Sequence, residues 1–176
     1  MKPLILILAL LLIVGCITAT PTAVPLAPYK AIYLTQDNGQ PSKEDLEAHP
    51  EISVTNSFDE FKQRTQKRTA LWIDINATGL VDRDWLNQKS QKFYPIVLVG
   101  NSNALCSFRD TLGGFGIIQG PYVDCSSPPS GFSVWTQKGT KPSDTSAFME
   151  GYEQIPTAQD ILEKTNLLLE GKNPGE

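Results

Sequence analysis

The sequence predicts an α/β fold, a three-layer sandwich around a mainly parallel central sheet of about five or six strands. Two observations favour this class. Apolar or β-branched segments alternate along the chain with amphipathic helical segments, which is the order that βαβ units require. Residues 94–99 (YPIVLV) form an apolar run without alternation, as expected of a parallel strand covered on both faces. The last strand or two can run antiparallel, and residues 132–138 alternate like a half-exposed strand.

The N-terminal part of the domain begins with a predicted strand at residues 29–35 (YKAIYLT), which are rich in aromatic and β-branched side chains. A short helix is expected at residues 43–48, and residues 52–54 predict a short strand at an edge of the sheet. Ser57 then begins a helix, because Glu60 stands three residues later and completes an S-x-x-E capping box.

The helix that begins at Ser57 ends in the one basic cluster of the chain, which consists of Lys62, Arg64, Lys67 and Arg68. Positive charge complements the negative end of the helix dipole, so we interpret this cluster as a solvated helix end. The alternative is a patch that binds an anion or a partner.

The middle of the chain continues the alternation of strands and helices. Residues 70–75 (ALWIDI) predict a second core strand. Asp82 is expected to cap the following helix, and Val81 with Leu86 can form a hydrophobic staple around that cap. A further helix is predicted at residues 103–112, directly after the central strand.

The C-terminal part contains one more strand prediction before the last helix. Residues 115–119 (FGIIQ) predict a strand, and residues 139–146 predict a polar loop. Thr157 begins the last helix, with Asp160 at the capping-box position. The apolar face of this helix is formed by Ile161, Leu162, Thr165, Leu168 and Leu169.

The N-terminus has the layout of an export signal, since Lys2 precedes an apolar run of eleven residues. A membrane-spanning helix needs about 20 apolar residues, so this run is too short to span. The sequence Ile13-Val14-Gly15-Cys16 resembles the lipobox of bacterial lipoproteins. The resemblance covers the first sixteen residues and implies cleavage after Gly15, a diacylglycerol on the Cys16 thiol and a further acyl chain on the new amino terminus. The alternative is an ordinary secreted protein that is cleaved near residues 17–19.

These features divide the chain into a signal peptide at 1–15, the lipidated Cys16 with a proline-rich tether at 16–28, and a single α/β domain at 29–176. Removing 15 residues from 176 leaves 161, which suits one domain with a substantial core. The formal net charge falls from −4 to −5 because Lys2 leaves with the signal. An acidic chain of this kind is not expected to bind nucleic acid, which requires Lys and Arg to neutralise phosphates.

Two cysteines remain once Cys16 carries lipid. Outside the reducing cytoplasm, Cys106 and Cys125 can form a disulfide, and closing a loop of this length would contribute about 3 kcal/mol. The alternative is a pair of independent buried thiols. Their spacing, with a single distant histidine, lacks the clusters that zinc sites use, so we expect no metal and no cofactor.

The turn after the central strand, Gly100-Asn101-Ser102-Asn103-Ala104, is close to the G-x-S-x-G elbow that carries a serine nucleophile. That design needs a histidine base later in the chain, whereas the one histidine, His49, lies upstream. Without a base the hydroxyl is a poor nucleophile. We therefore expect Ser102 or Asn103 to cap the next helix.

A second group of polar residues lies at or just after the carboxyl ends of predicted strands. Parallel strands bring these ends to one edge of the sheet, where open α/β sheets bind ligands. Asp74 could act there as a general base or a metal ligand, and the amides could bind a small polar molecule. The alternative is that these residues satisfy turns and helix caps. The candidate ligand-binding residues are Asp74, Asn76, Asn101, Ser102 and Gln119.

Together these patterns predict a lipid-anchored protein on the extracytoplasmic face of a bacterial membrane. Its domain is expected to bind a small polar ligand or another envelope protein without catalysis, because no nucleophile is paired with a base and no nucleotide loop is present. The alternative is an extracytoplasmic hydrolase or transferase that uses Asp74 at the carboxyl edge of the sheet. The sequence leaves open whether the protein is an enzyme.

Overall fold

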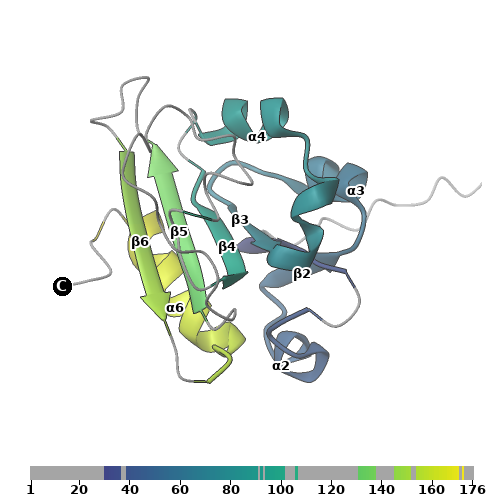
Figure 1. Cartoon of the computed structure of the whole chain (residues 1–176), viewed down its shortest axis with the longest axis vertical. Coiled ribbons are helices and arrows are strands. Elements are labelled where there is room, and N and C mark those ends of the chain that lie inside the picture. The colour runs from purple at the N-terminus through teal and green to yellow at the C-terminus, as the bar shows by residue number, and fades with distance from the viewer. Residues whose placement is uncertain are drawn as a thin grey trace, which may run out of the picture.

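The computed structural model describes residues 30–36, 39–90, 92, 94–101, 106, 131–137, 145–151, 154–170 and 172. Within these residues, one six-stranded sheet has the order β2-β1-β3-β4-β5-β6 (Figure 1). The strands are β1 (Ala31–Leu34), β2 (Ile52–Thr55), β3 (Ala70–Asp74), β4 (Ile96–Asn101), β5 (Gly131–Gln137) and β6 (Thr145–Gly151). The helices are α2 (Lys43–Glu47), α3 (Phe58–Arg64), the 3₁₀ helix η1 (Ile75–Leu80), α4 (Arg83–Ser90) and α6 (Ala158–Leu169).

The first four strands are parallel, and the last two are antiparallel to their neighbours. From β1 the chain crosses to β2 on one side and then returns to β3 on the other side. This reversal makes the carboxyl ends of β1 and β3 the topological switch point, where ligands of open α/β sheets bind. The α/β class, the mainly parallel sheet and the antiparallel last strands are confirmed.

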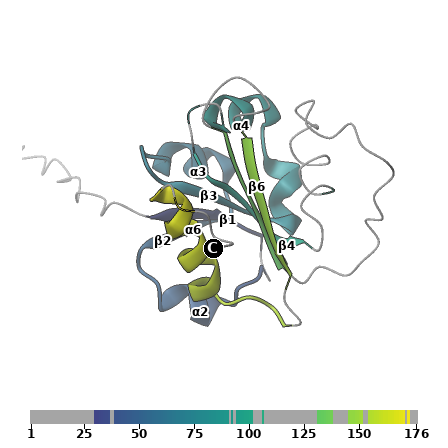
Figure 2. The same ribbon diagram turned by 90° about the vertical axis from the view of Figure 1, so that its left-hand side faces the viewer.

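The sheet is covered by helices on both faces. One hydrophobic cluster joins the sheet to α2 and α6, and a second joins it to α3 and α4 (Figure 2). The fully buried run from Ile96 to Val99 belongs to both clusters by alternation, which explains why this strand lacks polar residues. The complete three-layer sandwich stays a prediction, because most of the helix predicted at 103–112 lies outside the described residues.

Among the described residues, two of the three predicted helix caps are confirmed, and the third is half formed. At α6 the capping box is complete, and at α4 Asp82 Oδ1 accepts the Trp85 N–H at 3.0 Å. At α3 Ser57 Oγ accepts the Glu60 N–H at 3.5 Å, but the Glu60 carboxylate does not return to the Ser57 N–H. It accepts instead from Thr55 Oγ1 at 2.9 Å, and the predicted box at α3 is therefore only half formed.

The predicted polar loop at 139–146 is wrong at its end, because Thr145 begins strand β6. The segment TSAFMEG has few residues that favour strands, so local propensity gives little signal. Its strand conformation comes from pairing along its whole length with β5. The strand predicted at 115–119 lies outside the described residues, as do the signal peptide and the tether.

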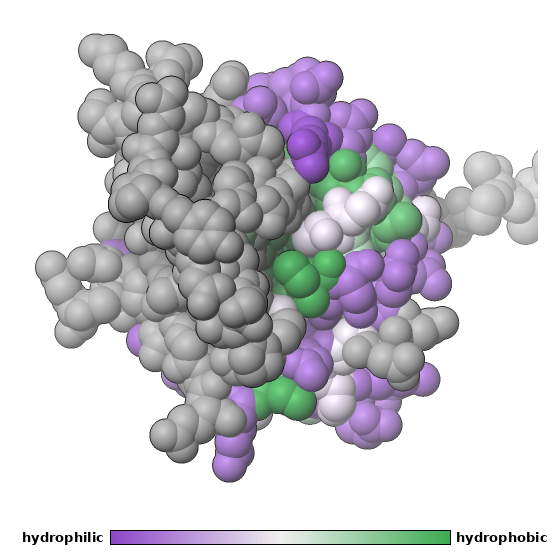
Figure 3. Space-filling view, viewed as in Figure 1, coloured by the Kyte–Doolittle hydropathy of each residue, from purple (hydrophilic) through white to green (hydrophobic). Residues whose placement is uncertain are grey.

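Exposed apolar side chains are scattered over the domain, and Figure 3 shows one face on which apolar groups lie among polar ones. Among the described residues, the large hydrophobic side chains with the highest exposure are Ile155 (54%), Val54 (40%), Ile75 (39%) and Leu80 (39%). Scattered residues of this kind are normal on a soluble surface. Val54 differs from the others because it lines a pocket, which is described below.

Candidate functional site

Asp74 lies at the carboxyl end of β3, and its side chain is only 3% exposed. Its Oδ1 atom accepts the Asn76 N–H at 2.9 Å and thereby caps η1. Its Oδ2 atom accepts the Gln40 N–H at 3.1 Å and the Tyr33 hydroxyl. Three donors therefore satisfy this carboxylate, as a buried charge requires.

Tyr33 comes from the neighbouring strand β1, where it pairs in register with Trp72. The two rings pack edge-to-face with centroids 6.0 Å apart. The hydroxyl lies between Asp74 Oδ2 and the Gln40 carbonyl oxygen, and it can donate its single proton to either. Burial, and then the negative charge of Asp74, raise the pKa of Tyr33 far above its usual value. The tyrosine is therefore a neutral hydrogen-bond donor near neutral pH.

The same contacts hold the loop that follows β1. Asn76 Oδ1 accepts the Gln36 N–H at 3.0 Å near the start of this loop, and Asp74 holds Gln40 near its end. The two anchoring side chains come from the last residue of β3 and from the start of η1. Asp74 and Asn76 were predicted as candidate ligand contacts, and in the structure both bind the backbone of the protein itself.

Two glycines allow close approach at this edge of the sheet. A Cβ atom added at Gly39 would lie 1.9 Å from Thr35 Oγ1 and 3.1 Å from Asp74 Oδ2. At Gly100, at the end of β4, φ is +75° and an added Cβ would lie 3.2 Å from Ile75 Cγ2. Glycine is the residue that tolerates both the positive φ and the short contacts, so the loop and η1 can pack tightly around Asp74.

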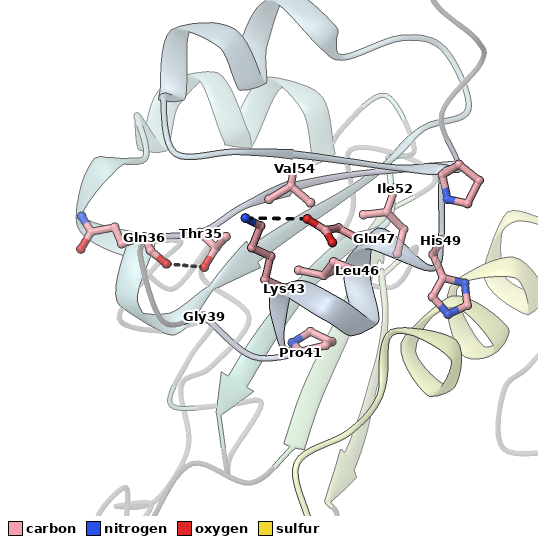
Figure 4. Close-up of a pocket in the computed structure, with 11 residues that line it drawn as sticks. Thr35, Gln36, Gly39, Pro41, Lys43, Leu46, Glu47, His49, Ile52 and Val54 are labelled. Carbon is pink, nitrogen blue, oxygen red and sulfur yellow. Dashed lines mark hydrogen bonds and ion pairs between the residues drawn. The ribbon is translucent and has the colours of Figure 1, made fainter.

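The anchored loop forms one wall of a pocket of about 430 Å³ between β2 and α2 (Figure 4). This volume lies within the range of roughly 300–1,000 Å³ that is typical of small-ligand sites. The apolar part of the lining consists of Pro41, Leu46, Pro50, Ile52 and Val54. The remaining lining residues are Thr35, Gln36, Gly39, Lys43, Glu47 and His49.

Figure 4 shows how these side chains are arranged. Val54 and Ile52 point from β2 toward α2, and Leu46 lies between them and the helix axis. Lys43 and Glu47 extend from α2 across the same space and form an exposed ion pair, with Nζ and Oε1 3.7 Å apart. The pocket therefore combines apolar side chains from β2 and α2 with one ion pair from α2.

Helix α2 is short, and contacts at both ends hold it in place. Ser42 Oγ accepts the Asp45 N–H at 3.2 Å and caps the helix. Asp45 Oδ2 accepts the Ala158 N–H of α6 at 2.6 Å, a contact between segments far apart in the sequence. Asp45 Oδ1 also lies 4.0 Å from His49 Nε2 at the end of the pocket. The pocket wall is thus tied to the last helix of the domain.

The other predicted site residues are only partly described. Asn101 ends β4, and the parallel register of β3 with β4 places its backbone at the same edge of the sheet as Asp74. Ser102 and Gln119 lie outside the described residues. Cys106 is disulfide-bonded. Its predicted partner Cys125 lies outside the described residues, so the pairing itself stays a prediction.

Sequence reasoning did not find the residues that form the pocket on β2 and α2. Val54, Ile52 and Leu46 have the spacing of ordinary core residues, and Lys43 with Glu47 has that of a surface ion pair. The one available signal was the expectation that residues 52–54 form an edge strand. An edge strand has no neighbouring strand on its outer side, and Val54 on β2 is 40% exposed.

Two kinds of feature are absent from the described part of the chain. No group of three or more His, Cys, Asp or Glu side chains there is placed to hold a metal ion. None of the helices there is both long enough and apolar enough to cross a bilayer.

Comparison with known proteins identifies no relative. No protein-family model matches the chain, and no match is found among curated proteins or among solved structures.

Proposed function

We propose that this protein is a lipid-anchored extracytoplasmic binding protein of the bacterial envelope. Its α/β domain binds a ligand in the pocket between β2 and α2 and does not catalyse a reaction on it. The lipid on Cys16 holds the domain at the membrane, and the tether of residues 16–28 provides reach. The lipobox sequence supports the anchor, and the anchored pocket loop supports the binding function.

The observation that carries the binding proposal is that the Asp74 carboxylate holds the backbone of the pocket loop. A general base needs a lone pair that can reach a substrate proton. The carboxylate of Asp74 is buried, and its two oxygens accept from Asn76, Gln40 and Tyr33. Such an arrangement suits a residue that fixes the shape of a pocket, and it supports binding over the alternative hydrolase or transferase that would use Asp74 as a base.

The binding proposal is tested by screening for ligands that stabilise the protein. The purified full-length protein is unfolded by heat in detergent while tryptophan fluorescence is recorded, in the presence of a library of small polar and amphipathic molecules. A ligand that binds the native state raises the midpoint of unfolding. At a concentration of one hundred times its Kd, it adds about 2.7 kcal/mol to the free energy of unfolding. The variant Leu46→Gln, which makes the pocket wall polar, should lose this response. A response that persists unchanged in the folded variant would place the ligand elsewhere.

The anchor is tested by labelling with radioactive palmitate. The wild-type protein should incorporate the label and fractionate with membranes, whereas Cys16→Ser should incorporate none. The variant Cys106→Ser serves as the matched control and should be labelled like the wild type. Label on the Cys16→Ser protein, or membrane retention of a cleaved Cys16→Ser protein, would contradict the anchor.

A further inference from the structure

The outer edge of β2 runs beside the pocket. In the described part of the chain, β2 is the last strand on its side of the sheet. Its partner β1 donates from Thr35 N to Thr55 O at 3.0 Å and from Ala31 N to Glu51 O at 3.3 Å. Backbone groups alternate in direction along a strand, so those of Ile52 and Val54 point away from β1, to the outer edge. The Ile52 N–H donates there to the His49 carbonyl oxygen at 2.9 Å, so the Val54 N–H is the outward donor that an added strand would use.

The two faces of this edge differ in chemistry. On the α2 face, Ile52 and Val54 form the apolar wall of the pocket. On the α3 face, Ser53 Oγ accepts from Arg64 Nη1 at 3.0 Å, and the Val54 carbonyl oxygen accepts from the same nitrogen at 3.1 Å. The edge of β2 is therefore apolar toward α2 and basic toward α3.

Arg64 covers part of this edge through its contact with the Val54 carbonyl oxygen. Its guanidinium is also paired with Glu60 Oε2 at 2.9 Å, and its side chain is one-third exposed. Lys67 and Arg68 lie exposed in the turn that follows α3, and Arg64 is the cation whose own contacts place it on the edge of β2. This is the basic cluster that the sequence analysis interpreted as a solvated helix end.

We propose that the outer edge of β2 binds an extended segment of another protein in which apolar and acidic residues alternate. Side chains of an added strand point alternately to its two faces, so the apolar set enters the pocket beside Val54 and the acidic set meets Arg64. Arg64 then exchanges the Val54 carbonyl for a carboxylate, which forms the stronger, charge-assisted hydrogen bond. The freed carbonyl accepts a backbone N–H of the added strand. This inference rests on the proposed function, since it names the ligand of the same pocket.

The probes are two synthetic peptides, acetyl-Glu-Val-Glu-Val-Glu-Val-Glu-amide and the same peptide with lysine in place of glutamate. Binding to the full-length protein in detergent is measured by fluorescence anisotropy with a dye on the peptide. The acidic peptide should bind with a Kd below about 1 mM and at least about tenfold more tightly than the basic peptide. This preference should weaken as salt is added, because the contacts of Arg64 are partly exposed.

Matched variants separate the apolar contact from the charge contact. Val54→Gln should weaken binding of the acidic peptide about tenfold, since the pocket loses an apolar wall. Ile155→Gln makes the same kind of change at a side chain that is 54% exposed and lies outside the pocket, and it should bind like the wild type. Arg64→Gln should abolish the preference for the acidic peptide over the basic one.

Hydrogen exchange reports on strand addition directly. The Val54 amide, which points to the outer edge, should exchange more slowly when the acidic peptide is bound. Equal binding of both peptides, equal binding by Val54→Gln, or unchanged exchange at Val54 would overturn the inference. Dimerisation of the free protein through this edge would also overturn it, because a second copy would then be the occupant. If small molecules stabilise the protein and no peptide binds, this inference fails while the proposed binding function stands.

Discussion

Replacing Asp74 with Asn should destabilise the domain strongly, although the change is nearly isosteric. The carboxylate accepts from the N–H groups of Asn76 and Gln40 and from the Tyr33 hydroxyl. A carboxamide has one acceptor oxygen and a donor NH₂ group. If the oxygen stays with Asn76, the NH₂ group faces two other donors in a site that is 3% exposed.

The magnitude follows from the bonds that are lost. Tyr33 can turn its proton to the Gln40 carbonyl, so one hydrogen bond to a charged acceptor is lost at the Gln40 N–H, at about 1.5–3 kcal/mol. The unmatched buried donors cost about 1–3 kcal/mol more. We expect the free energy of unfolding to fall by about 3–5 kcal/mol. For a domain of this size, this corresponds to a midpoint lower by roughly 10 °C.

The assay is thermal and urea unfolding followed by tryptophan fluorescence. Asp59→Asn is the matched control, because Asp59 forms an exposed ion pair with Lys62 and its loss should leave the midpoint nearly unchanged. A double-mutant cycle with Tyr33→Phe should give a coupling energy of at least about 1 kcal/mol. If Asp74→Asn lies within about 0.5 kcal/mol of the wild type, the carboxylate does not anchor the loop and the reasoning is refuted.

Three further predictions test neighbouring parts of the structure. Because the pKa of Tyr33 is raised, the unfolded chain loses the hydroxyl proton near pH 10.0 while the folded chain keeps it. The free energy of unfolding of the wild type should therefore fall relative to that of Tyr33→Phe by about 1.4 kcal/mol per pH unit above pH 10, and parallel profiles of stability against pH would contradict this. Gly39→Ala should cost about 1–3 kcal/mol through overpacking, whereas Gly79→Ala, where an added Cβ meets nothing within 4 Å, should be nearly neutral in the same unfolding assay. Alkylation of the unfolded protein without reductant should label neither Cys106 nor Cys125, and labelling of both would exclude their disulfide.

Local patterns predicted those elements whose own residues have a clear hydrophobic pattern or a capping signal. The central strand was found because an unbroken apolar run from Ile96 to Val99 cannot stand beside water, and it lies inside the sheet. Strand β6 was missed because its sequence has few residues that favour strands, and its conformation comes from its pairing with β5. The capping box at α3 was predicted in full and is half formed, because Thr55 on β2 takes the Glu60 carboxylate. The Glu60 carboxylate therefore bonds to a residue of the neighbouring strand and not to the N-cap of its own helix.

The candidate site shows the same division. That Asp74 lies at the end of a core strand was visible in the sequence, and so was its place at the carboxyl edge of a parallel sheet. Whether its oxygens face a ligand or the protein depends on Tyr33, Gln40 and Asn76, and two of these lie more than thirty residues away. The pocket has the same origin, since Leu46 and Val54 come from different elements that meet only in the folded chain.

The sequence by itself determined the class of fold, the order of its strands and α-helices up to β4 without the 3₁₀ helix η1, and an N-terminus that predicts export and lipid attachment. Each of these depends on residues that are contiguous or periodic along the chain. The tertiary structure alone decided the strand order, the role of Asp74 as an anchor of the pocket loop, and the exposed outer edge of β2 beside that pocket. These depend on contacts between segments that are distant in sequence, and hydrophobic periodicity carries no information about which distant segments will meet.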